Sequence, residues 1–178
     1  WKGLVGSEMC IRDRSGRGMK EIKSSIQQYS EKNKLNFYTP NNLKKNETLK
    51  LLVSLNPDLI VVVAYGLLIP EVILKIPSHG CINGHASLLP KWRGAAPIQR
   101  AIEAGDKTTG CTSMLMQKGL DTGPMIHKKE ILIMMENDVI DLFKSLSLLT
   151  AECIHETIQK LISGNSKQTP QNLSLIHI

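Results

Sequence analysis

The run at residues 59–64, LIVVVA, constrains the fold of this chain more than any other segment. All six residues are aliphatic, and apolar and polar positions do not alternate along the run. A strand of this composition is typical of a position where both faces of the sheet are covered, as in the middle of a parallel sheet. We therefore expect residues 59–64 to form a buried strand of an α/β domain.

Helical and strand patterns alternate along the rest of the chain. The spacing of apolar residues predicts helices over residues 19–34, 42–55, 70–74, 95–104 and 138–164. It predicts further strands over residues 35–38, 80–83, 112–116 and 125–133, the last of them antiparallel or at an edge. In the last helix the expected core face consists of Leu142, Phe143, Leu146, Leu149, Cys153, Ile154, Ile158 and Leu161. This order of elements predicts an α/β fold with a mostly parallel sheet.

Composition excludes several classes of protein. The four cysteines are scattered and form no CxxC pair, which argues against a zinc ribbon or a disulfide scaffold and favours a reducing, cytoplasmic location. No apolar run approaches the ~20 residues that a membrane helix needs. The formal net charge of +6 is compatible with a polyanionic partner.

The two ends are set apart from the fold. Residues 1–14 include GSEMCIRDR, and residues 173–178 are LSLIHI; both look like translated sequencing-adapter DNA. We interpret both segments as non-native and assign residues 15–172 to a single partial domain.

Three polar side chains stand where a sheet of this kind places its functional residues. Asn83 and His85 leave the end of a predicted buried strand, and Asp121 lies in the loop between two later strands. Each alone is more often a turn or structural residue. Together, an amide donor, an imidazole and a carboxylate could stabilise an oxyanion and move a proton.

At these residues the chain resembles the folate-dependent formyltransferase family. Residues 80–90, GCINGHASLLP, look like its Asn-x-His motif followed by Ser-Leu-Leu-Pro, and residues 119–123, GLDTG, are similar to its Asp-Thr-Gly loop. Residues 91–102, KWRGAAPIQRAI, most resemble the branch that acts on methionyl-tRNA, and residues 15–18 and 62–66 add to the match. The resemblance covers about residues 15–172 and implies a Rossmann-like fold of the formyltransferase type.

The resemblance implies transfer of a formyl group from 10-formyltetrahydrofolate to the α-amine of methionyl initiator tRNA. Asn83 and His85 would then stabilise the oxyanion, while Asp121 would orient His85, favour its charged form and accept a proton. An α-amine titrates at about 7.7–8.0, so part of it is already nucleophilic at neutral pH. The reaction requires no metal, and we expect none.

The same resemblance assigns the binding residues. Folate is expected to contact Tyr65, Gly66, Leu67, Ser87, Leu88, Leu89 and Pro90. The tRNA is expected to contact Arg17, Lys20, Lys91 and Arg93, whose charges would give a salt-dependent affinity. We expect the complete protein to be a monomer that does not bind membranes.

Two features depart from the family pattern. Gly84 stands where the family usually has a branched or other apolar residue. The family's first strand, its following helix, its second strand and its C-terminal β-barrel domain have no counterpart in the sequence. We therefore expect a sheet that is incomplete on its N-terminal side. Because an edge and apolar surface would be left uncovered, we expect little or no activity from the 178 residues alone.

Three alternatives stay open. The acceptor could be a small amine such as glycinamide ribonucleotide or an amino sugar. The sequences at residues 110–112 and 123–126 slightly favour the ribonucleotide enzyme, but residues 92–102 outweigh them. Water could replace the amine, so that the same folate is hydrolysed. The chain could also be a non-catalytic module that binds folate or RNA.

Overall fold

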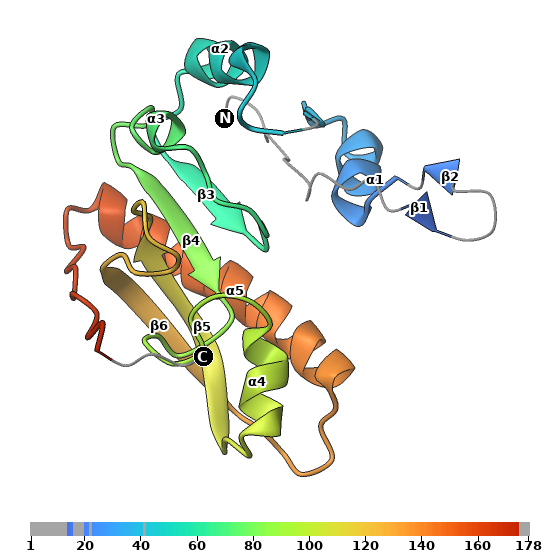
Figure 1. The fold of residues 1–178 in the computed structure, drawn as a ribbon, viewed down its shortest axis with the longest axis vertical. Helices are drawn as coiled ribbons and strands as arrows, with labels where there is room; N and C mark the ends of the chain where they lie inside the picture. The colour runs from blue at the N-terminus through green and yellow to red at the C-terminus, as the bar shows by residue number, and fades with distance from the viewer. Residues whose placement is uncertain (1–13, 16–19, 22, 41, 175–178) are drawn as a thin grey trace. The chain divides into compact units, whose positions relative to one another are not determined.

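The computed structural model describes residues 14–15, 20–21, 23–40 and 42–174, which fall into two compact units (Figure 1). One unit contains the described residues up to 57 together with residues 65–76. The other contains residues 58–64 and those from 77 onward, and it carries the predicted catalytic residues.

The first unit contains a short hairpin and three helices. Strands β1 (Arg14–Ser15) and β2 (Lys20–Glu21) pair antiparallel, and the helices are α1 (Ser25–Lys32), α2 (Asn46–Leu55) and α3 (Glu71–Leu74). The predicted helix over 19–34 begins only at residue 25, because the Ser24 hydroxyl oxygen accepts a hydrogen bond from the Gln27 N–H at 3.2 Å and caps α1 there. The strand predicted over 35–38 is absent from this part of the structure.

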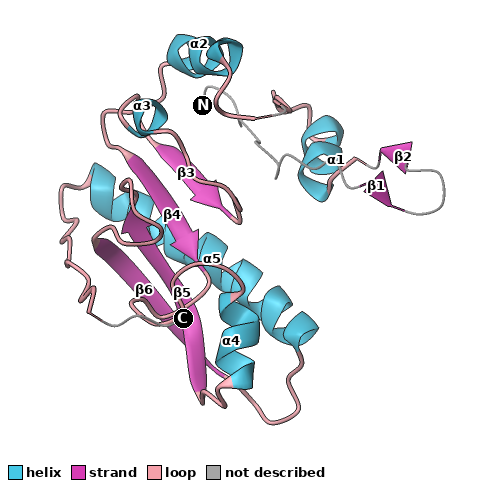
Figure 2. Ribbon diagram, viewed as in Figure 1, coloured by secondary structure: helices cyan, strands magenta, loops and turns pink. Residues whose placement is uncertain are grey.

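Four strands form the sheet of the second unit (Figure 2): β3 (Ile60–Val63), β4 (Cys81–His85), β5 (Thr108–Leu115) and β6 (Met125–Leu132), in that order. The α/β class is confirmed, but the described sheet is mixed rather than mostly parallel. Only β3 and β4 run parallel; β4 with β5 and β5 with β6 are antiparallel. The loop and helix α4 (Pro97–Glu103) after β4 deliver the chain to β5 at the carboxyl end of β4, so β5 must run back. The expectation that 125–133 would be antiparallel or at an edge is confirmed.

Strand β3 is less covered than its sequence predicts. Val62 is buried, but the side chains on the other face, Val61 and Val63, are 42% and 52% exposed. Side chains alternate between the two faces of a strand, so one face of β3 has no cover from a described element of its own unit. The prediction of a strand buried on both faces is wrong for the described residues.

The long helix α5 (Val139–Ile162) lies across one face of β4, β5 and β6 (Figure 1). Asp138 caps it through a reciprocal capping box with Asp141. Leu142 and Leu146 pack with Ile98 of α4 in a buried cluster. Phe143 was predicted in the core but is 62% exposed, because it lies about 100° around the helix from Leu142.

The buried stripe of α5 continues through two polar residues, Thr150 and Thr157, which an apolar pattern does not reveal.

Among the helices that the structure describes, none combines the length and the hydropathy needed to cross a membrane.

Candidate active site

Strand β4 presents its two polar residues on one face and a glycine on the other. Asn83 and His85 are two residues apart, so they share a face. Gly84 faces α5: a Cβ added there would lie 2.8 Å from Thr150 Cγ2 and 3.2 Å from Ile154 Cδ1. The absence of a side chain at residue 84 therefore lets α5 pack directly against the strand that carries the candidate catalytic residues.

Asp121 lies in the tight loop between β5 and β6. The loop passes so close to the end of β5 that a Cβ at Gly123 would lie 1.7 Å from the Leu115 carbonyl oxygen. Asp121 itself has φ of 50°, in the left-handed region that residues with a side chain rarely adopt. The conformation of this loop directs the Asp121 carboxylate toward β4.

The three predicted catalytic side chains meet at one point. Asn83 Nδ2 donates to Asp121 Oδ1 at 3.1 Å, and His85 Nδ1 lies 3.6 Å from Asp121 Oδ2. The backbone N–H of Gly94 donates to the same Oδ2 at 2.9 Å. The His85 and Asp121 side chains are only 8% and 11% exposed. Both side chains therefore lie largely out of contact with water.

The other ring nitrogen of His85 is held as well. Its Nε2 lies 2.8 Å from the backbone carbonyl oxygen of Trp92. A carbonyl oxygen can only accept a hydrogen bond, so Nε2 carries the proton of this contact. The imidazole is thus fixed between a backbone acceptor on one side and the Asp121 carboxylate on the other.

The loop after β4 is held by side chains that the sequence analysis did not single out. Thr112 Oγ1 donates to the Ser87 carbonyl oxygen at 2.7 Å and accepts from the Leu89 N–H at 3.0 Å. The Lys128 ammonium donates to the Leu89 carbonyl oxygen, and partial burial lowers the pKa of this lysine. A lone threonine within a strand carries no sequence signal for such a role.

The predicted folate residues divide between the two units. The side chains of Ser87 and Leu89 are completely buried, and the Ser87 hydroxyl donates to the Lys91 carbonyl oxygen at 2.6 Å, so both shape the loop from inside. Leu88 and Pro90 are half-buried. The remaining predicted residues, Tyr65, Gly66 and Leu67, belong to the first unit. Their contact with folate stays a prediction.

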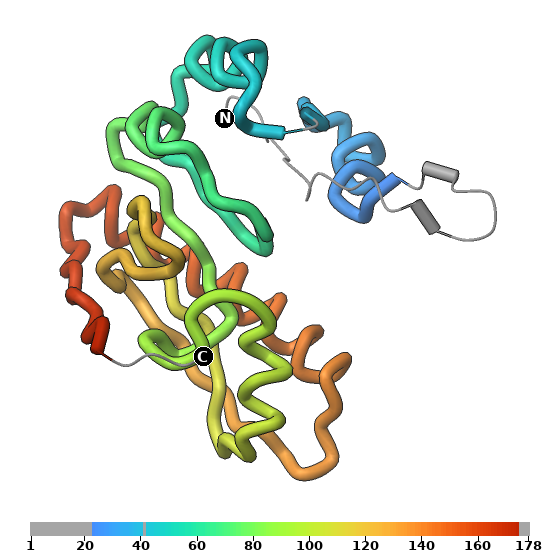
Figure 3. The backbone as a smooth tube through the Cα atoms, in the orientation of Figure 1, coloured from blue at the N-terminus to red at the C-terminus, as the bar shows by residue number. Residues whose placement is uncertain are grey.

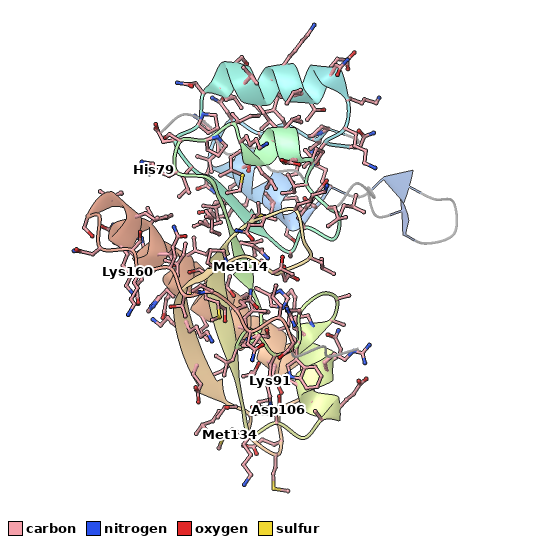
Figure 4. The ribbon with its side chains drawn as sticks, turned by 60° about the vertical axis from the view of Figure 1, so that its left-hand side comes forward. His79, Lys91, Asp106, Met114, Met134 and Lys160 are labelled. Carbon is pink, nitrogen blue, oxygen red and sulfur yellow. The ribbon has the colours of Figure 1, made fainter. Side chains whose placement is uncertain are left out.

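Of the four predicted tRNA residues, the structure describes the side chains of Lys91 and Arg93. Arg17 lies outside the described residues, and so does the side chain of Lys20. Lys91 Nζ pairs with Asp106 Oδ1 at 2.8 Å (Figure 4). The indole N–H of Trp92 donates to the other oxygen of Asp106 at 2.8 Å. Arg93 is half-buried. The charge of Lys91 is therefore partly neutralised within the protein.

Comparison with known proteins shows the family of the chain. A family model described as formyl transferase matches residues 10–158. The chain belongs to the formyl transferase family. Among curated relatives of this family, the methionyl-tRNA formyltransferase of Idiomarina loihiensis is 43% identical over 89% of this chain and 50% of its own length. That of Caldanaerobacter subterraneus subsp. tengcongensis is 49% identical over 84% of this chain and 48% of its own.

The chain thus spans about half the length of the curated relatives it matches. Solved structures confirm the fold. The phosphoribosylglycinamide formyltransferase of Bacillus halodurans superposes with a TM-score of 0.71 at 24% identity, covering 79% of this chain and 76% of that one. A formyltetrahydrofolate deformylase from Pseudomonas syringae pv. tomato gives 0.70 at 20% identity, covering 83% and 53%. The Rossmann-like fold of the formyltransferase type is therefore confirmed.

Proposed function

We propose that this protein transfers a formyl group from 10-formyltetrahydrofolate to the α-amine of methionyl initiator tRNA. The observation that carries the chemistry is the contact of Asn83 and His85 with the same carboxylate, Asp121, at 3.1 and 3.6 Å. The identity of 43–49% with methionyl-tRNA formyltransferases supports this acceptor over a small amine. The phosphoribosylglycinamide enzymes among the structural neighbours are at most 24% identical and share the fold.

The first chemical step creates an oxyanion. The amine nitrogen forms a bond to the formyl carbon, and the carbonyl electron pair moves onto the formyl oxygen. Asn83 has two amide N–H groups, of which Asp121 accepts one, and we assign the other to this oxygen. We assign the second donor to His85, whose Nε2–H would exchange the Trp92 carbonyl oxygen for the oxyanion when the substrate is bound. A donor aimed at an oxyanion contributes on the order of 10²–10³ in turnover.

The second step expels tetrahydrofolate. The bond between the formyl carbon and N10 breaks, N10 takes up one proton, and the attacking nitrogen loses one. Asp121 lies beside both Asn83 and His85. This position suits it to accept the proton from the nucleophile, directly or through one water. Its Oδ2 also orients the imidazole of His85.

Substrate binding follows from the surroundings of these residues. Because the side chains of Ser87 and Leu89 are buried, we assign the folate contact of residues 87–90 to the backbone and to Leu88 and Pro90. Arg17, Lys20, Lys91 and Arg93 remain the proposed tRNA contacts. The proposed function implies a cytoplasmic protein, and we expect a monomer.

An assay of acceptors tests the proposal. The protein encoded by the complete reading frame is incubated with 10-formyltetrahydrofolate and with initiator Met-tRNA, glycinamide ribonucleotide, an amino sugar nucleotide or water alone. We expect formyl-Met-tRNA to be formed with the highest kcat/KM. A higher kcat/KM for a small amine, or release of formate without transfer, would replace the proposed acceptor. No turnover with any acceptor would leave a binding module.

Substitutions in the same protein test the residue assignment. Asn83→Ala and His85→Ala each remove one proposed oxyanion donor, so we expect kcat to fall by roughly 10²–10³. Circular dichroism and thermal unfolding of both variants check that the fold is retained. Folded variants with kcat within about threefold of the parent would contradict the assignment, since such a change is far below the loss of one donor.

A further inference from the structure

The segment after α5 returns to the sheet and reaches the Asp121 loop (Figure 3). Thr169 pairs with Met125 at the start of β6 through two backbone hydrogen bonds of 2.8 Å, one in each direction. This pairing fixes the backbone two residues before Gln171. Gln171 therefore reaches the loop from a segment whose backbone is held by hydrogen bonds, although about 50 residues separate Gln171 from Asp121 in the sequence.

The side-chain amide of Gln171 binds the backbone on both sides of Thr122. Its Nε2 donates to the carbonyl oxygen of Asp121 at 2.8 Å and to that of Gly123 at 2.7 Å. Two acceptors at one end of the amide identify that end as the nitrogen. The other end, Oε1, is buried and has no hydrogen-bond partner among the described residues. Burial of Oε1 without a hydrogen bond is unfavourable, whereas the two hydrogen bonds of Nε2 hold the loop.

The loop needs such support because Asp121 is in the left-handed region, at φ 50°. A residue with a side chain in a sparsely populated backbone region costs about 1–3 kcal/mol and persists only where its surroundings hold it. Asn83 and the Gly94 N–H hold the Asp121 carboxylate, whereas Gln171 holds its carbonyl oxygen. Backbone and side chain of the same residue are therefore fixed by different parts of the unit.

We propose that Gln171 is a positioning residue that keeps the Asp121 carboxylate in place against Asn83 and His85. It touches none of the reacting atoms and acts through the loop backbone. This inference rests on the proposed function for its effect on rate, because it concerns the same carboxylate. A misplacement of about 1 Å at such a site lowers turnover by up to 10²-fold, which sets the scale of the expected effect.

The test replaces Gln171 in the protein encoded by the complete reading frame. Gln171→Glu keeps the size of the side chain but places carboxylate oxygens against two carbonyl oxygens. We expect kcat for formyl transfer to fall by roughly 10- to 100-fold with KM for the folate changed by less than about threefold. Gln168→Glu is the matched control, since it makes the same change three residues earlier on an exposed side chain. We expect its kcat to stay within about twofold of the parent.

The pH profile separates positioning from a general loss of stability. A protonated carboxyl group has an O–H that can donate to one of the two carbonyl oxygens. The rate of Gln171→Glu relative to the parent should therefore rise as the pH is lowered. Gln171→Met, which is close in size, removes the donors without adding charge and also removes the unpartnered oxygen. It serves where Gln171→Glu does not fold. A folded Gln171→Met with the parent's kcat would overturn the proposal.

Hydrogen exchange at Gly94 gives a readout that does not depend on activity. Its N–H donates to Asp121 Oδ2, so displacement of the carboxylate should raise its exchange rate in the Gln171 variants and not in Gln168→Glu. Faster exchange in a protein that has no formyl transferase activity would support positioning and reject the proposed function. Unchanged exchange in an active protein would reject positioning and leave the function intact.

Discussion

The two faces of strands β4 and β5 are built on different principles. On the face toward α5, small side chains allow close contact: Gly84 lies against Thr150, and Ser113 Oγ lies 2.5 Å from Thr157 Oγ1. On the opposite face, Asn83 and His85 are held by hydrogen bonds and charge from the Asp121 loop. The helix face therefore depends on shape, and the site face depends on polar contacts supplied by distant segments.

The two thiols on the helix face are also small side chains that are closely packed. Cys111 and Cys153 are completely buried between β5 and α5. Their mutual hydrogen bond and their burial raise the pKa of Cys111, which keeps its thiol protonated and unreactive. The difference between the faces implies that substitutions toward α5 change mainly stability, whereas substitutions on the site face change mainly turnover.

The largest expected effect is on the site face. Asp121→Asn keeps the size of the side chain but removes its charge and turns one acceptor into a donor facing the Asn83 or Gly94 N–H. We expect kcat for formyl transfer to fall by about 10²–10³, and the donor left facing an N–H should lower stability by about 1–3 kcal/mol. Asp58→Asn, at an exposed aspartate before β3, is the control and should leave both unchanged. A loss of stability without a loss of kcat would contradict the division between the two faces.

A smaller effect is expected where α5 meets β4. Gly84→Ala would bring Cβ to 2.8 Å from Thr150 Cγ2, and overpacking of this kind costs about 1–3 kcal/mol. Urea unfolding measures this change, and kcat under folding conditions should stay near the parent value. Thr150→Ser removes the opposing methyl group and keeps the hydroxyl. In the double variant we expect recovery of at least about 0.5 kcal/mol relative to additivity. Strictly additive effects would show that the two residues do not constrain each other.

The smallest effect is expected at the exposed rim between β6 and α5. Hydrogen bonds from Lys129 and His127 lower the pKa of the Glu156 carboxyl group in the folded protein. A lowered folded pKa stabilises the protein above the unfolded value of about 4.3, and this contribution is lost as the pH falls through the folded pKa.

The free energy of unfolding of the parent should therefore exceed that of Glu156→Gln at pH 7, and the difference should vanish in acid. Urea unfolding at a series of pH values checks this. Glu130→Gln is the control, because that carboxylate is exposed and has no ion-pair partner among the described residues. A difference for Glu156→Gln that does not vary with pH would contradict the assignment, and kcat should be unaffected in both variants.

The sequence predicted most elements of the second unit and the meeting of three site residues. Asn83 and His85 follow a strand pattern at the right spacing, and Asp121 lies two residues before a glycine that the loop requires. The direction of β5 was not predictable, because it depends on where α4 delivers the chain. Coverage of β3 was overestimated, because an aliphatic run shows what a strand could bury and not which neighbours are present.

The contacts that complete the site were also beyond prediction. The Gly94 N–H and the Trp92 carbonyl oxygen are backbone groups. Almost every residue has the same groups, so the sequence does not mark these two. Gln171 and Thr112 act through single polar atoms, and their position depends on a chain path that periodicity does not specify. Site residues in motifs can be predicted from sequence, whereas the groups that position them need the fold.

The contact between Gly84 and Thr150 bears on how sequences in this family can diverge. A larger residue on the strand costs less stability once the helix has lost a methyl group, so the order of the two substitutions sets how far stability falls between them. A lineage with glycine at residue 84 can keep a branched side chain at residue 150, whereas a bulkier strand residue favours a smaller one on the helix. The residues at these two positions should therefore vary together among relatives.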